Sequence, residues 1–132
     1  MIQLEAHFTR AGDAIAASGG QTLARWLSLD AVAGGPETVA NIARKLGLTR
    51  QSVQRVADLL EADGLTEYRD NPEHQRSKLV VITARGRRAL AAIRASQRAW
   101  AEQVGADVGE SDLRQLSRIV ERLTRALVSR AR

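Results

Sequence analysis

The chain has 132 residues and a formal net charge of +5, with 44% hydrophobic but only 3% aromatic residues. Its lack of cysteine excludes disulfides, thiol catalysis and cysteine-based zinc or redox sensing, and its two distant histidines argue against a metal site. It has no signal-peptide pattern at its start and no apolar run of membrane-spanning length, so we expect a soluble cytoplasmic protein. The basic charge favours a polyanionic partner.

Two helices are predicted at the start of the chain. Residues 2–17 carry apolar side chains at helical spacing until Gly19 and Gly20 break the pattern. Residues 21–33 predict a second helix, which ends at the Gly34-Gly35-Pro36 turn. The apolar residues that define these helices are Ile2, Leu4, Phe8, Ala11 and Ile15, and then Leu23, Trp26, Leu27 and Val32.

Residues 38–63 predict a helix-turn-helix unit. Thr38 is a suitable N-cap for a short helix over 39–46, and Gly47 suits the left-handed backbone that often ends a helix. Thr49 is a second N-cap, for a helix that closes at Gly64. The expected core residues of this second helix are Val53, Val56, Leu59 and Leu60. Two helices joined by a tight glycine-containing turn are typical of DNA-binding units.

The second helix of this unit begins with long polar side chains that can reach base edges in a major groove. They are Arg50, Gln51, Gln54 and Arg55. Arginine can clamp guanine, and glutamine can clamp adenine, through two hydrogen bonds each. Thr49 and Ser52 are short and suit phosphate contacts at the helix start. The alternative is a solvated helix face that has no partner.

A hairpin follows, with strands predicted over 66–70 and 79–83. The intervening loop, 71–78, opens with Asn71-Pro72 and is polar and long for a hairpin. Its length and its basic end, with Arg76 and Lys78, indicate a loop that makes a contact.

Two helices complete the chain. A long one is predicted over 84–104, interrupted by Gly105 and Gly109, and the last begins at Gly109 or Ser111. Apolar residues in the last helix recur at spacings of 3, 4, 3 and 4, which is a heptad-like pattern. They are Leu113, Leu116, Val120, Leu123 and Leu127. Together with Leu4 and Phe8 they predict a homodimer interface, and an intramolecular core is the alternative.

This ordered set of features resembles MarR-type transcriptional regulators. The resemblance rests on residues 38–53, 59–65, 71–72, 76–79 and 83–86. It implies a mainly α fold with a small β-hairpin, formed by one domain over 1–132. A winged helix-turn-helix DNA-binding core, 36–83, would be flanked by dimerisation helices over 1–33 and 84–132.

The resemblance also assigns roles within the loop over 71–78, the wing. Arg76 matches the arginine that enters the minor groove, but His74 stands where the family commonly has an aspartate that orients it. Glu73 could replace that aspartate, or the wing could be more mobile. The candidates for phosphate contact are Thr38, Arg44, Lys45, Thr49, Ser52, Ser77 and Lys78. Arg69 is either a further phosphate contact or a partner of Glu67 or Asp70.

The sequence therefore predicts a dimeric repressor that binds double-stranded DNA at a pseudo-palindromic operator. Its recognition helix, 49–63, would enter the major groove and its wing the minor groove. The resemblance implies release by a small-molecule effector of unknown identity, with His7, Arg25, Trp26 and Trp100 as pocket candidates and packing as the alternative for the tryptophans. No cofactor, metal or membrane partner is expected. A protein-interaction module is the main alternative, and an enzyme is disfavoured because no catalytic motif is present.

Overall fold

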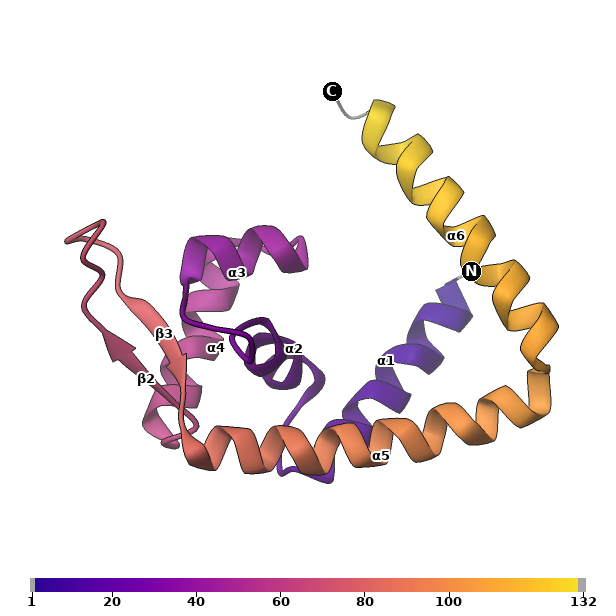
Figure 1. Cartoon of the computed structure of the whole chain (residues 1–132), viewed down its shortest axis with the longest axis horizontal. Coiled ribbons are helices and arrows are strands. Elements are labelled where there is room, and N and C mark those ends of the chain that lie inside the picture. The colour runs from indigo at the N-terminus through magenta and orange to yellow at the C-terminus, as the bar shows by residue number, and fades with distance from the viewer. Residues whose placement is uncertain (1, 131–132) are drawn as a thin grey trace. The chain divides into compact units, whose positions relative to one another are not determined.

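The computed structural model describes residues 2–130 as a mainly helical chain with a small antiparallel sheet (Figure 1). In chain order the elements are α1 (Ile2–Ala17), α2 (Leu23–Ala31), β1 (Glu37–Thr38), α3 (Val39–Leu46), α4 (Arg50–Ala62), β2 (Thr66–Arg69), β3 (Leu79–Ile82), α5 (Ala84–Val108) and α6 (Glu110–Arg130). The predicted fold class is confirmed. The chain forms two compact units, Met1–Ser96 and Gln97–Arg132. None of the helices within residues 2–130 is long and apolar enough to cross a membrane.

The helix-turn-helix of the first unit is α3 and α4, and both predicted N-caps are present. The hydroxyl of Thr38 accepts from the backbone N–H of Asn41 at 3.2 Å. The hydroxyl of Thr49 accepts from the N–H of Ser52 at the same distance. Gly47 ends α3 with φ of 65°, a conformation in which a side chain would be strained.

The sheet joins the wing to the helix-turn-helix. Its strand order is β1-β3-β2, and both pairs are antiparallel. Thr66 pairs with Ile82, and Arg69 pairs with Leu79, so the loop 71–78 extends beyond the paired strands. The two-residue strand β1, which pairs Thr38 with Leu79, was not predicted, because two residues are too short to show an alternating pattern.

The core of the first unit is built around one face of α4. Val53, Ala57 and Leu60 of this helix are each 1% exposed. Their spacing of four and three residues places them on a single face. Leu59 was expected in this core, but it is 50% exposed, because its position turns it away from the face that Val53 defines.

The second unit contains the end of α5 and all of α6. Gly105 was expected to interrupt the helix, but it lies within α5, which continues to Val108. The break falls at Gly109, whose φ of 91° is open to glycine at no steric cost. No α6 residue among those described is buried. Its exposed apolar side chains include Leu116, Ile119, Val120, Leu123 and Leu127.

The glycine at the start of α5 permits a close approach between this helix and the chain after α4. A Cβ atom added at Gly86 would lie 2.1 Å from the backbone oxygen of Leu65, which is far inside van der Waals contact. Thr83 fixes the same approach, because its backbone N–H donates to that oxygen at 3.1 Å and its hydroxyl donates to the oxygen of Gly64 at 2.7 Å.

We expect Gly86→Ala to lower the free energy of unfolding by about 1–3 kcal/mol or more, because the added methyl group forces the two segments apart. Gly105→Ala is the matched control in the same helix. A Cβ atom there meets Leu113 at an ordinary 3.7 Å, so the higher helix propensity of alanine should stabilise by about 0.5–1 kcal/mol. Urea unfolding followed by circular dichroism measures both, and equal effects would contradict the role of Gly86.

Candidate nucleic-acid interface

The start of α4 presents its polar side chains away from the core. Val53 of this helix is buried, whereas the four predicted base-reading residues are exposed. These are Arg50, Gln51, Gln54 and Arg55. Within residues 2–130, Gln54 is the only one of the four whose side chain makes a hydrogen bond or ion pair. The other three side chains are therefore available to a partner.

A groove of about 400 Å³ lies between the start of α4 and the wing. Three cations that are distant in sequence line it, namely Arg50, Arg76 and Lys78, and none of its lining residues is acidic. The other lining residues are Thr38, Val39, Ala40, Gln54, Tyr68 and Ser77. Folding thus gathers predicted contacts from β1, α4 and the wing around one basic groove. Such a concentration of cations attracts the phosphates of a nucleic acid backbone.

The hydroxyl groups at the turn before α4 are engaged within the turn itself. Thr49 donates its hydroxyl hydrogen to Ser52 Oγ at 3.0 Å, and Ser52 donates its own to the Thr49 carbonyl at 2.9 Å. A phosphate oxygen needs donors, so a phosphate at this turn would be bound by the backbone N–H groups at the helix start.

Two other basic candidates are paired with carboxylates. Lys45 forms an ion pair with Glu37, whose pKa is lowered chiefly by the hydrogen bond from Lys45, with partial burial opposing it and Asn41 adding to it. Arg69 donates from Nε to Glu67 at 2.7 Å, so the strand-surface ion pair is the arrangement present. Lys45 and Arg69 are thus less available to phosphate than Arg44, which is exposed and has no partner among the described residues.

A polar cluster of three side chains connects the recognition helix to β2. Tyr68 donates its hydroxyl hydrogen to Asp58 Oδ1 at 2.6 Å. Gln54 donates from Nε2 to the same Asp58 oxygen at 2.9 Å and to the Tyr68 hydroxyl at 3.0 Å. The hydrogen bond from Tyr68, and then that from Gln54, lower the pKa of Asp58. Burial, reinforced by the bond to Asp58, raises the pKa of Tyr68.

Hydrogen bonds from backbone N–H groups within the wing hold its conformation. The N–H of Glu73 donates to Asn71 Oδ1 at 3.0 Å, and the N–H groups of His74 and Ser77 donate to carbonyls three residues earlier. Arg76 is exposed and forms no ion pair with Glu73 or with another carboxylate in the described chain.

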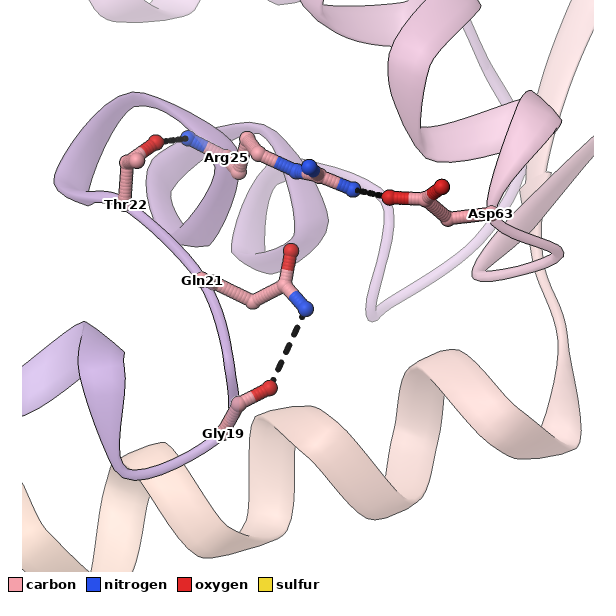
Figure 2. Close-up of polar contacts among 5 residues, drawn as sticks. All are labelled: Gly19, Gln21, Thr22, Arg25 and Asp63. Atoms are coloured by element: carbon pink, nitrogen blue, oxygen red, sulfur yellow. Dashed lines mark hydrogen bonds and ion pairs between the residues drawn. The ribbon is translucent and has the colours of Figure 1, made fainter.

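An ion pair between Arg25 and Asp63 tethers α2 to the end of the recognition helix (Figure 2). Asp63 is the C-cap of α4, and Thr22 accepts from the backbone N–H of Arg25 at 3.4 Å as the N-cap of α2. The hydrogen bond and charge of Arg25 lower the pKa of Asp63. Arg25 thereby links the start of one helix to the end of the helix that carries the base-reading candidates.

The residues predicted for an effector pocket lie on three helices, with His7 on α1, Arg25 and Trp26 on α2, and Trp100 on α5. The guanidinium of Arg25 is held by Asp63, Trp26 belongs to the core at 9% exposure, and His7 is exposed on α1. Trp100 lies in the second unit and is half-buried.

A polar cavity of about 820 Å³ lies beside Asp63 in the first unit. It is lined by Ser18, Gly19, Gly20, Gln21, Asp63, Leu65, Arg85, Arg88 and Ala89. Sequence reasoning did not associate Gln21, Arg85 and Arg88 with a pocket. The cluster of arginines at 85–88 was the available signal in the sequence.

Comparison with known proteins gives concordant matches. The model of the MarR family matches residues 20–77. The uncharacterised protein Rv2011c of Mycobacterium tuberculosis is 47% identical over 93 residues, which make up 70% of this chain and 65% of that protein. The crystal structure of the MarR family transcription regulator SP03579 is 26% identical, with a TM-score of 0.90 over 99% of this chain and 87% of the other. The M. tuberculosis regulator MOSR, solved in complex with DNA, is 24% identical, with a TM-score of 0.79 over 96% and 92% of the two chains.

We expect Arg25→Met to raise the pKa of Asp63 toward its ordinary value, as followed by NMR titration of the side-chain carboxyl. The folded-state pKa is lowered, so the pair stabilises the protein above the unfolded-state pKa, and this contribution is lost as the pH falls through the folded-state value. The melting temperatures of wild type and Arg25→Met should therefore converge in acid. Arg69→Met is the control, because it removes the ion pair between Arg69 and Glu67 within β2. A difference that is independent of pH would contradict the electrostatic role of Arg25.

Proposed function

We propose that the chain, which the model of the MarR family matches over residues 20–77, is a sequence-specific DNA-binding regulator of that family that represses transcription from a pseudo-palindromic operator. The observation that carries this proposal is the basic groove between α4 and the wing. In it, Arg50, Arg76 and Lys78 converge beside a helix start whose base-reading side chains are exposed. No catalytic role is proposed, and the site of action would be the cytoplasm.

Binding would place α4 in the major groove and the wing in the adjacent minor groove. Arg50, Gln51, Gln54 and Arg55 would read base edges. Arg76 would enter the minor groove without the carboxylate that usually orients it, so its placement would depend on the narrow groove's negative potential. Lys78, Ser77, Thr38 and Arg44, with the backbone at Thr49, would contact phosphates. The solved DNA complex of MOSR, which shares this fold, supports the proposal.

A second copy of the chain is part of the proposal. The apolar side chains of α6 lie exposed along one helix face, which a soluble monomer rarely leaves uncovered. Leu116, Val120, Leu123 and Leu127 are each at least 50% exposed and follow the heptad spacing of a helix–helix interface. Leu113 would continue this seam, and Leu4 and Phe8 of α1, at 56% and 55% exposure, would add to the interface. Two copies would read two half-sites.

The proposal includes regulation by a small molecule. The polar cavity beside Asp63 is a candidate site in the first unit, and Arg85 and Arg88 suit an anionic ligand. A ligand there would act next to the Arg25–Asp63 tether and thus at the end of the recognition helix.

We expect Arg50→Ala to weaken operator binding by about 1–3 kcal/mol and to relax the base preference at one position in each half-site. Arg94→Ala removes the same charge from α5, where Arg94 pairs with Asp30, and should have little effect. Selection of bound fragments from genomic DNA, followed by fluorescence-anisotropy titrations at several salt concentrations, measures both effects. The logarithm of the binding constant should fall with slope about −0.9 per phosphate contact.

Two results would change this interpretation. A uniform loss across all DNA sequences would make Arg50 a phosphate anchor. Failure of the wild type to enrich any palindromic site would favour the alternative, a winged-helix module that binds an acidic protein.

We expect Leu123→Glu to convert the protein from a dimer to a monomer at micromolar concentration, because two charges would be buried in a symmetric interface. Multi-angle light scattering measures the mass, and operator binding should be lost in parallel. Gln115→Glu adds the same charge to the exposed surface of the same helix outside the heptad seam and should leave a dimer. A wild-type protein with the mass of one chain would contradict the dimer.

A further inference from the structure

The cluster formed by Gln54, Asp58 and Tyr68 constrains how the recognition helix can read a base. Gln54 lines the basic groove and is exposed, so its side chain is within the surface proposed to meet DNA. Its amide group is nevertheless already engaged, on its nitrogen side, by one residue of α4 and one of β2.

The direction of each hydrogen bond in the cluster follows from chemistry. An ionised carboxylate has no hydrogen to donate, so the Tyr68 hydroxyl must donate to Asp58. For the same reason, the amide nitrogen of Gln54, and not its oxygen, must face Asp58. The amide oxygen then lies on the other side of the group, and no hydrogen bond within residues 2–130 uses it.

A glutamine held by these bonds can make fewer hydrogen bonds to a base than a glutamine whose amide is free. Clamping adenine requires the amide to accept from the base amino group and to donate to the ring nitrogen N7. Here the nitrogen of Gln54 already donates to two acceptors and lies beside the negative charge of Asp58. That charge repels N7, which is itself an acceptor. The oxygen remains free to accept.

We propose that Asp58 and Tyr68 restrict Gln54 to reading as a hydrogen-bond acceptor, so that one operator position in each half-site selects a base with a major-groove amino group. Adenine and cytosine present such a donor, whereas guanine and thymine present acceptors. Tyr68 and Asp58 are positioning residues in this scheme. The inference rests on the proposed function and revises the expectation that Gln54 clamps adenine through two bonds.

The test is a selection from randomised operators with the full-length protein, scored as base preference rather than affinity. Gln54→Ala identifies the position that Gln54 reads. At this position the wild type should accept adenine and cytosine to a similar extent and reject guanine and thymine. Gln115→Ala is the matched control, because Gln115 is an exposed glutamine of α6 outside the cluster and outside the proposed DNA-binding surface, and it should leave this position unchanged.

Two variants release the amide nitrogen. Tyr68→Phe removes one acceptor, and Asp58→Ala removes the carboxylate and the charge. Each should shift the preference at the Gln54 position toward adenine over cytosine by about fivefold, the size expected for one additional hydrogen bond. Asp58 is exposed, so its variant keeps the test valid if Tyr68→Phe folds poorly.

Different results separate this inference from the proposed function. A wild type that selects adenine alone at the Gln54 position, or an adenine-to-cytosine ratio that neither variant changes, would overturn the acceptor role while leaving the regulator intact. A wild type that enriches no operator would overturn the proposed function and the inference with it.

Discussion

The buried face of α4 is the constraint on which the DNA-facing surface depends. Val53, Ala57 and Leu60 fix the rotation of this helix about its axis, and the polar side chains that alternate with them must then point outward. The ends of α4 are held independently, by the Thr49 cap at its start and by the Arg25 tether at its C-cap. Rotation and axial position are therefore set by different interactions.

The basic groove has a different origin, because it is assembled by tertiary structure. Arg50 belongs to α4, while Arg76 and Lys78 belong to the wing, which follows β2 along the chain. The antiparallel pairing of β2 with β3 brings the two segments to one surface, and β1 connects that sheet to the start of α3. The groove is thus lined by residues of the helices, the sheet and the wing that are distant in sequence.

Much of this architecture could be predicted from local signals. The caps Thr38 and Thr49 and the left-handed Gly47 are encoded in a few neighbouring residues, and each was found where predicted. Contacts between elements were not predictable in the same way. The pairing of Lys45 with Glu37 and the bonds that Tyr68 makes to Gln54 and Asp58 depend on side-chain placement that periodicity does not encode. The continuation of α5 through Gly105 shows a further limit, since a glycine inside a helix costs only about 1 kcal/mol, which neighbouring turns can offset.

The lack of buried residues in α6 has a consequence for the lifetime of the protein in a cell. Most of the stability of a helix in a protein comes from packing of its apolar face, so the order of α6 would come from the proposed pairing with a second copy. Pairing follows mass action, and a newly made chain at low abundance would spend more time with its leucines uncovered. Those chains are the ones that proteases and chaperones would engage first. The rate at which the chain is degraded would then depend on the rate at which it is made, because both act through the pairing of α6. This dependence would not involve any contact with DNA.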